Sequence, residues 1–351
     1  MPKRHGNLWE KIVSRENLML AYKKAAKGKS VRASVRKFAK NLERNLETLR
    51  QSLLDRTFRT SPYRSKEIYE PKKRVIYILP FCPDRIVQHA VMNVLEPIWT
   101  SMMIRDTYAC IKGRGIHAGS RRTMDFARRN KYALKCDISK FYPSIDHAVM
   151  KSVIRRKIKD RDVLWLLDGI IDSFPGSKNA PIGNYCSQWF GNLYMGELDH
   201  FVKSELCVRD YIRYCDDFIL FANDKRQLRA WLGAVGEFLG SRLGLGFSKS
   251  DIFPVSRGID FLGYRHFRDF VLLRKSTAQR LKRKVAALPR LVGEGRMGID
   301  HARAFLASVS GWFRWACSRN LGSRLNAGLR PFAARLAAGG ADGFTLFLQG
   351  S

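Results

Sequence analysis

Three aspartates stand where their carboxylates could act on one substrate. Asp137 lies at the end of the β-prone segment YALKCDIS, and Asp216 and Asp217 separate two apolar runs in DYIRYCDDFILFA. The second segment predicts a hairpin, so we expect the three carboxylates at one edge of a sheet. Clustered carboxylates favour a hard cation between them, and Mg²⁺ leaves coordination sites free for phosphates. Two Mg²⁺ ions about 4 Å apart would activate a 3′-hydroxyl and stabilise a pyrophosphate leaving group, which is nucleotidyl transfer.

A structural interpretation of these aspartates stays open. An Asp at the end of a strand commonly forms a turn or caps a helix, and a pair of Asp residues is common in hairpin turns. The context, YCDD between two β runs with a preceding acid in DISKFYPSID, favours the catalytic interpretation.

The charge of the chain predicts a polyanionic partner. The 351 residues carry a formal net charge of +33, and 45% of them are hydrophobic, enough for a folded core. Residues 1–64 contain 17 basic and 5 acidic side chains, and residues 265–351 contain 16 and 4, so both ends are more basic than the centre. Such an excess concentrates nucleic acid at the surface, with an anionic membrane surface as the alternative partner.

Several classes of protein are excluded by what the sequence lacks. No run of about 18 apolar residues occurs, and no apolar stretch follows the basic N-terminus, so we expect neither a membrane span nor a secretory signal. The seven cysteines form no C-x-x-C pair, which argues against a zinc ribbon and fits reduced thiols in a cytoplasm. Carboxylates should therefore hold any bound metal.

Hydrophobic spacing predicts the elements that position the aspartates. Apolar residues three and four apart indicate basic helices before Ser61-Pro62, and KKRVIYILP indicates a strand. Further along we expect a helix over 84–96 that ends at Pro97, a strand over 132–139, a hairpin over 210–222, basic helices after 270, and a loosely ordered tail over 333–344. The predicted layout has a basic helical part (1–64), an α+β part (65–264) and a basic helical part with the tail (265–351).

The order of the motifs in the α+β part resembles that of reverse transcriptases. LKCDISKFYPSIDH is similar to their motif A, and YIRYCDDFILFAND to the Y-x-D-D box of motif C. The remaining motifs, from the two fingers motifs through motifs B, D and E, resemble KRVIYILPFCPDRIVQH, TYACIKGRGIHAG, APIGNYCSQWFGNLYMGELD, LGLGFSKSD and GIDFLGYRHF. The resemblance implies an α+β right-hand polymerase with fingers, a palm whose antiparallel sheet packs on helices, and a helical thumb.

The resemblance also implies roles for individual residues. The catalytic and metal-binding set, which would hold two Mg²⁺ ions, is Asp137, Asp216 and Asp217 with the backbone carbonyl of Ile138. The nucleotide-binding set comprises two triphosphate clamps, an aromatic side chain that blocks a 2′-hydroxyl and a proton donor to pyrophosphate: Arg74, Arg85, Tyr142 and Lys249. The primer and template contacts are Gly263, Tyr264 and Trp312. Simpler roles stay open, namely backbone-phosphate contacts or surface charge for the arginines and core packing for Tyr142 and Trp312.

Motif B departs from most reverse transcriptases, which have Gln-Gly followed three residues later by Ser-Pro. Here Ile182-Gly183 is followed by Ser187-Gln188, a pattern that resembles the enzymes of diversity-generating retroelements, and Ile182, Gly183 and Gln188 would bind the nucleotide. A Gln at position 182 would position the nucleotide through a hydrogen bond worth about 1 kcal/mol, and its loss would reduce fidelity. Alternatively, Ile182 only packs between fingers and palm and Gln188 caps a backbone group.

The same resemblance implies mutagenic retrohoming, in which template-repeat RNA is copied into adenine-mutagenised cDNA. The implied partners are template RNA, the cDNA/RNA duplex, deoxynucleoside triphosphates and a small basic accessory protein that forms a pentamer. The protein would be bacterial or phage-encoded and cytoplasmic. The short C-terminal part leaves no room for the extra domains of many group II intron proteins, and the V-T-G thumb signature of retrons is absent. The alternatives are a retron-like, CRISPR-associated or phage-defence reverse transcriptase of ordinary fidelity, and an inactive RNA-binding protein, against which the three intact aspartates argue.

Overall fold

The computed structural model describes residues 4–69 and 73–318, together with 320–325, 327, 329 and 332. The chain forms two compact units, each built from several segments. Unit 1 comprises Met1–Lys112, Lys135–Leu220 and Arg229–Asp251, and unit 2 comprises Gly113–Leu134, Phe221–Leu228 and Ile252–Ser351. The functional division at residues 64 and 264 stays a prediction, and the predicted tail over 333–344 lies outside the described residues.

The N-terminal part of unit 1 is helical, as the spacing of apolar residues predicts. Its helices are α1 (Trp9–Val13), α2 (Arg15–Ala26), α3 (Ala33–Ala39) and α4 (Leu42–Leu54). Ser14 caps α2 because its hydroxyl accepts a hydrogen bond from the Asn17 amide at 3.1 Å. Leu46, Leu49 and Leu53 lie on one face of α4 and are buried.

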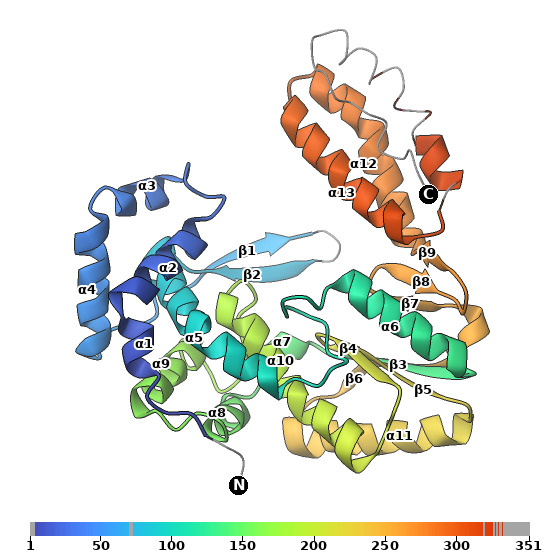
Figure 1. The fold of residues 1–351 in the computed structure, drawn as a ribbon, viewed down its shortest axis with the longest axis horizontal. Helices are drawn as coiled ribbons and strands as arrows, with labels where there is room; N and C mark the ends of the chain where they lie inside the picture. Colours follow the sequence, from blue (N-terminus) through green and yellow to red (C-terminus); the bar gives the residue numbers. More distant parts are fainter. Residues whose placement is uncertain are drawn as a thin grey trace. The chain divides into compact units, whose positions relative to one another are not determined.

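The helix predicted over 84–96 is longer than expected. It forms α5 (Ile86–Met102), and Pro97 lies inside it, so the prediction that Pro97 ends the helix is wrong. A proline within a helix removes one backbone hydrogen bond. Leu95 and Trp99, on either side of Pro97, are both fully buried, and their packing stabilises the continued helix. Figure 1 shows α5 beside α2 within unit 1.

A two-stranded hairpin follows the N-terminal helices. Strands β1 (Arg64–Ile68) and β2 (Arg74–Ile78) are antiparallel, with Arg64 opposite Ile78. β2 confirms the strand predicted in KKRVIYILP. A short turn segment, η1 (Phe81–Arg85), then leads into α5.

The central sheet has four strands in the order β4-β5-β3-β6. Their bounds are Tyr211–Tyr214, Asp217–Ala222, Tyr132–Ile138 and Phe247–Pro254. β3 and the β4–β5 hairpin confirm the strand and hairpin predicted over 132–139 and 210–222. Helices pack on this sheet within each unit: Gly236 of α11 (Lys225–Phe238) lies against Phe247, and Phe126 of α6 (Ile116–Arg129) contacts Phe221.

Further helices of unit 1 follow β3 in the chain. They are α7 (Phe141–Ser144), α8 (His147–Arg155), α9 (Arg161–Ile171) and α10 (Tyr185–His200), and short helical turns η2 (Phe201–Glu205) and η3 (Leu239–Leu243) end α10 and α11. α10 is buried along most of its length, because apolar residues such as Trp189, Leu193 and Leu198 alternate with small ones.

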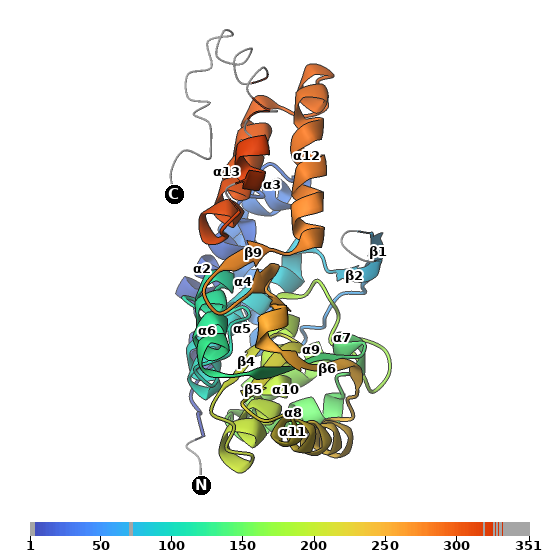
Figure 2. The same cartoon turned by 90° about the vertical axis from the view of Figure 1, so that its right-hand side faces the viewer.

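Unit 2 joins a small antiparallel sheet to two long helices. After the turn η4 (Val255–Arg257), strands β7 (Ile259–Phe261), β8 (Tyr264–His266) and β9 (Val271–Leu273) pair in sequence order. Figure 2 shows α12 (Lys275–Gly293) and α13 (Ile299–Trp315) side by side. Buried residues from the strands and both helices form one hydrophobic core. These helices confirm the helical pattern predicted after residue 270.

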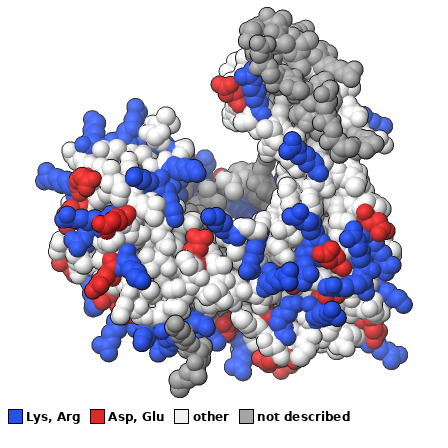
Figure 3. Space-filling view, viewed as in Figure 1, with Lys and Arg blue, Asp and Glu red and all other residues white. Residues whose placement is uncertain are grey.

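The surface is rich in cations. Lys and Arg predominate over Asp and Glu on the face shown in Figure 3. Among the described helices, none combines the length and the hydropathy that crossing a membrane requires.

Candidate active site

The aspartates predicted to be catalytic lie on neighbouring strands of the central sheet. In the β4–β5 hairpin Tyr214 pairs with Asp217, which leaves Cys215 and Asp216 as the two turn residues. Cys215 has a φ of 56°, in the left-handed region that tight two-residue hairpin turns require. Asp137 lies near the end of β3, the strand next to β5. The fold therefore brings Asp137 and Asp216 to the same region of unit 1.

Each flanking carboxylate has a polar partner. Asp137 Oδ2 accepts a hydrogen bond from the Ser248 hydroxyl at 2.6 Å, and Asp217 Oδ2 lies 3.1 Å from Lys135 Nζ. Lys135 precedes Asp137 by two residues on β3, so both side chains project from the same face of the strand. Ser248 and Lys135 were not predicted as site residues, because nothing local in the sequence marks them as partners of these carboxylates.

The aspartates of the YCDD turn are hard to ionise without a cation. Burial raises the pKa of Asp216, and the nearby charge of Asp137 raises it further. Burial also raises the pKa of Asp217 to about 6, although Lys135 opposes the shift. In addition, Asp217 Oδ1 is buried without a hydrogen-bond partner. A bound cation would stabilise the ionised forms of these groups.

The donor chemistry fits a divalent metal. Across the described part of the chain, no three His, Cys, Asp or Glu side chains form a group arranged to hold a metal ion. Mg²⁺, however, commonly takes only one or two carboxylates and completes its coordination with water and substrate phosphates. Asp137 and Asp216 supply such a pair of hard oxygen ligands, and the Ile138 carbonyl lies next to Asp137 in the chain.

A buried ion pair lies behind the YCDD turn. Arg213 and Asp199 are both completely buried, with Arg213 Nε and Nη2 donating to the two carboxylate oxygens at 2.7 and 2.6 Å. Tyr211 and Thr107 each donate a hydroxyl hydrogen bond to Asp199 at 2.8 Å. Arg213 Nη1 donates to the carbonyl of Cys215 at 2.8 Å, so the network holds the backbone of the turn.

Sequence reasoning missed this network. Arg213 was visible as a cation between apolar residues in YIRYCDD, where β alternation predicts burial on one side. Its partner Asp199 is 14 residues earlier, on α10, and only the tertiary fold shows that the two meet.

Tyr142 lies close to the YCDD turn. Its hydroxyl and ring are 3.5 and 3.4 Å from the position that a Cβ on Gly191 would occupy, so the ring lies against α10. Burial raises the pKa of Tyr142, and the neighbouring Cys215, Cys110 and Asp216 add to the shift. The phenol therefore stays neutral and half-buried beside Asp216.

The motif B loop connects the catalytic region to β2. The Ala180 amide donates to the carbonyl of Tyr142 at 2.9 Å, and the Tyr77 amide donates to the carbonyl of Ile182 at 2.7 Å. Gly183 has a φ of 117°, and a Cβ there would lie 2.3 Å from the Tyr77 carbonyl oxygen. Only glycine fits this close approach of two backbones.

The side chains of the predicted motif B residues differ in exposure. Ile182 is half-buried, whereas Gln188, in the first turn of α10, is exposed. Ile182 contacts β2 through its backbone, which is compatible with both the nucleotide-binding and the packing interpretation.

Arg74 and Arg85, the two predicted triphosphate clamps, have different charged neighbours. Arg74, exposed on β2, lowers the pKa of Asp216, so its charge acts on the YCDD turn. Arg85, half-buried at the end of η1, has Arg32 as its charged neighbour, and the pKa of Arg85 is lowered by burial and by Arg32. The structure thus associates Arg74 with the aspartates and Arg85 with another group of cations.

The remaining predicted residue of unit 1 is at the surface. Lys249 on β6 is exposed and lies 3.0 Å from Asp251. Its role in protonating pyrophosphate stays a prediction.

The predicted primer and template contacts lie in unit 2. Gly263 has a φ of 83°, and a Cβ there would be 2.7 Å from the Trp312 ring. Tyr264 is fully buried, and its ring centroid is 5.1 Å from that of Trp312. The half-buried Trp312 packs against the core of unit 2. These contacts favour core packing for the side chains of Tyr264 and Trp312. The backbone of the turn at Gly263 would therefore have to make any primer contact here.

Comparison with known proteins identifies the family of this fold. The family model described as "Reverse transcriptase (RNA-dependent DNA polymerase)" matches residues 63–266. Protein YkfC of Escherichia coli K12 is 27% identical over 315 residues, which cover 76% of this chain and 78% of YkfC. The group II intron-encoded protein LtrA of Lactococcus lactis is 25% identical over 170 residues (46% of this chain, 28% of LtrA). The retron Ec73 reverse transcriptase of E. coli is 28% identical over 199 residues (50% and 60%). The chain thus spans less than two thirds of the length of LtrA and of the retron Ec73 reverse transcriptase.

Proposed function

This chain belongs to the reverse transcriptase family and carries an RNA-directed DNA polymerase domain, and we propose that it copies the template RNA of a diversity-generating retroelement into adenine-mutagenised cDNA. The observation that carries the proposal is the motif B loop, where Ile182 replaces the Gln of most reverse transcriptases and is joined through its backbone to Tyr77 of β2. The resulting cDNA would replace a variable region of a target gene by mutagenic retrohoming.

In the proposed mechanism, Asp137 and Asp216 would hold two Mg²⁺ ions with the Ile138 carbonyl, and Asp217 would complete the acidic cluster. When bound, the ions would favour ionisation of the primer 3′-hydroxyl and neutralise charge on the departing pyrophosphate. The turn that carries Asp216 is kept in position by the hydrogen bond from buried Arg213 to the Cys215 carbonyl. A fixed turn avoids reorganisation of the charged groups during the reaction.

Substrate binding in this proposal uses residues around the turn. Arg74 binds the triphosphate, since its charge already acts on Asp216. Tyr142 excludes a ribose 2′-hydroxyl, because its ring is held against α10 near Asp216. Lys249 protonates pyrophosphate, and the turn at Gly263 contacts the primer.

Low fidelity would follow from the chemistry of Ile182. An aliphatic side chain cannot donate a hydrogen bond to the incoming nucleotide, so the correct and incorrect pairs differ less in transition-state free energy. Gln188, exposed on α10, would contact the nucleotide or template.

The proposed organisation and partners follow from the same function. Residues 1–64 extend the fingers, 65–264 contain fingers and palm, and 265–351 form the thumb and tail, and both basic ends would bind the template RNA and the cDNA/RNA duplex. A small basic accessory protein that forms a pentamer would join the enzyme in the cytoplasm of a bacterium, with RNA offsetting the repulsion between two basic proteins.

The test is to sequence cDNA made by the chain on a defined RNA template with Mg²⁺ and four deoxynucleoside triphosphates, with and without the accessory protein. We expect errors concentrated opposite template adenines, reduced in the Ile182→Gln variant and retained in the matched Ile182→Val variant. Faithful cDNA from the unaltered chain under both conditions would contradict the diversity-generating assignment.

A second candidate is a retron-like reverse transcriptase of ordinary fidelity. It is favoured by the 28% identity to the retron Ec73 enzyme over half of this chain. The same sequencing experiment separates the two candidates, since ordinary fidelity gives no excess of errors at adenine.

A further inference from the structure

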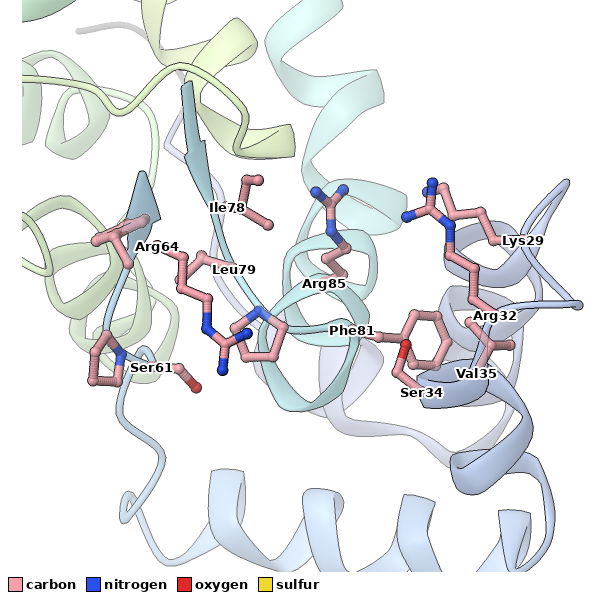
Figure 4. Close-up of a pocket in the computed structure, with 13 residues that line it drawn as sticks. Lys29, Arg32, Ser34, Val35, Ser61, Arg64, Ile78, Leu79, Phe81 and Arg85 are labelled. Carbon is pink, nitrogen blue, oxygen red and sulfur yellow. The ribbon is translucent and has the colours of Figure 1, made fainter. Parts of the chain in front are cut away.

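Unit 1 contains a second basic site, formed by residues of the N-terminal helices and of η1. It is a pocket of about 590 Å³ between the α2–α3 connection, the start of the β1–β2 hairpin and η1 (Figure 4). Lys29, Arg32, Arg64 and Arg85 line it, together with the hydroxyls of two serines. A pocket of this size is in the range that accommodates a small ligand or part of a larger one.

Three of the cations act on one another. Arg85 and Arg32 both lower the pKa of Lys29, in addition to the larger effect of burial. Arg32 likewise adds to the effect of burial in lowering the pKa of Arg85. In Figure 4 the head groups of Lys29, Arg32 and Arg85 point toward the same side of the pocket. Their mutual repulsion disfavours the charged forms of Lys29 and Arg85.

No carboxylate of the described residues forms an ion pair with these cations. Within the part of the chain that the structure describes, Lys29, Arg32, Arg64 and Arg85 form no ion pair. The buried Asp84 does not fill this role, because its Oδ1 accepts from the Ser61 amide at 2.9 Å and burial dominates its raised pKa. An anion in the pocket would supply the missing negative charge.

Aromatic packing fixes the segments that carry the cations. Tyr22 of α2, Phe38 of α3 and Phe81 of η1 contact one another, with ring centroids 5.7 to 6.1 Å apart. The Arg32 amide donates to the Lys29 carbonyl at 3.0 Å, which keeps the two cations on one turn of the backbone. The basic cluster is therefore held by the folded core of unit 1 rather than by surface side chains alone.

We propose that Lys29, Arg32 and Arg85 form a binding site for a phosphate group that is separate from the triphosphate site at Arg74. The phosphate belongs to the RNA backbone, because the charged neighbours of Arg85 are Arg32 and Lys29, whereas Arg74 is the arginine that acts on Asp216. The arginines supply planar forks for phosphate oxygens, and Lys29 supplies a point charge. The site deepens the proposed function, on which the choice of RNA as the ligand rests, and it assigns Arg85 to this pocket instead of to the catalytic triphosphate.

The test uses the full chain with Arg32→Ala and Arg85→Gln, and with Arg36→Ala as the matched control. Arg36 is an exposed cation on the same helix as the pocket lining but is not part of the pocket. Affinity is measured by fluorescence anisotropy with a labelled 20-nucleotide single-stranded RNA across a salt series, without metal or nucleotide. KM for the deoxynucleoside triphosphate is measured separately by primer extension, and thermal unfolding reports on folding.

We expect each pocket variant to weaken RNA binding about tenfold and to leave the nucleotide KM unchanged, as loss of a charge-assisted hydrogen bond to an RNA phosphate implies. A changed RNA affinity with an unchanged KM identifies the backbone as the source, with a salt slope smaller by about 0.7 per lost contact. A raised KM with unchanged RNA affinity would return Arg85 to the triphosphate and overturn the separate site. Thermal stability should be unchanged or higher, because a repelling charge is removed. Variants that match Arg36→Ala in both measurements would overturn the proposal.

The outcome of this binding test does not depend on the proposed diversity-generating function. RNA binding is measured without catalysis, so faithful cDNA synthesis would contradict the diversity-generating assignment and leave the phosphate site standing. Conversely, adenine-directed errors with unaltered RNA affinity and KM in the pocket variants would remove the site alone.

Discussion

Replacing Asp199 by Asn tests the buried network behind the catalytic turn. The substitution keeps the size of the side chain but removes the only carboxylate that contacts the guanidinium of Arg213 among the hydrogen bonds described above. Both residues are fully buried, so water cannot replace the lost charge. Removing one partner of a buried pair costs about 3–5 kcal/mol, a large fraction of the total stability of about 5–15 kcal/mol.

The matched control is Asp162→Asn, which removes the partner of Arg56 in an exposed ion pair. Exposed pairs contribute about 0–1 kcal/mol. Urea unfolding at 25 °C, followed by circular dichroism, should therefore show a free energy of unfolding lower by about 3–5 kcal/mol for Asp199→Asn and nearly unchanged for Asp162→Asn. Equal effects of the two substitutions would refute the argument from burial.

A double variant separates folding from positioning. Arg213→Met with Asp199→Leu removes both charges, and well-packed apolar replacements of buried pairs are often neutral in stability. The Cys215 carbonyl then has no guanidinium donor, so we expect near-normal unfolding but a reduced kcat in primer extension. Full kcat in a stable double variant would show that the network does not position the turn.

Three further predictions concern other parts of the molecule. Gly183→Ala should lower the free energy of unfolding by about 2 kcal/mol, because the new Cβ would meet the Tyr77 carbonyl at a strained φ. Gly293→Ala should leave it unchanged, because a Cβ there has no atom within 4 Å. Equal urea midpoints for the two variants would contradict this prediction. Tyr142→Ala should raise ribonucleotide incorporation about tenfold in single-nucleotide extension while Tyr142→Phe should not, and an unchanged ratio would remove the blocking role. Burial lowers the pKa of His266 to about 4, below its unfolded value of about 6.5. The neutral imidazole therefore stabilises the fold above pH 6.5, and the free energy of unfolding should fall by about 2 kcal/mol between pH 6.5 and 5. An equal fall in the His266→Gln variant would exclude this cause.

Local patterns were sufficient for the elements that carry the aspartates. The alternation of apolar residues around Cys215-Asp216 predicted a tight hairpin, and the structure confirms it with Tyr214 opposite Asp217. These features depend on residues close in sequence, so periodicity and turn chemistry were enough to predict them.

Features that depend on distant contacts were not predictable in the same way. Pro97 indicates a helix end by local chemistry, but burial of Trp99 keeps the helix intact. Arg85 reads as a triphosphate clamp within its motif, yet its charged neighbours Lys29 and Arg32 come from a segment more than 50 residues earlier. Tertiary packing determines which charges meet, and a single sequence does not contain that information explicitly.

The most direct test of the central claim is primer extension on an RNA template by Asp137→Asn and Asp216→Asn, beside Asp55→Asn as an exposed carboxylate control at the end of α4. RNA affinity and thermal unfolding are measured for each variant to exclude misfolding. If Asp137 and Asp216 hold the catalytic ions, both variants will bind RNA normally and make no detectable cDNA, while Asp55→Asn will remain active. Continued cDNA synthesis by a folded Asp216→Asn variant would contradict the assignment of the catalytic site.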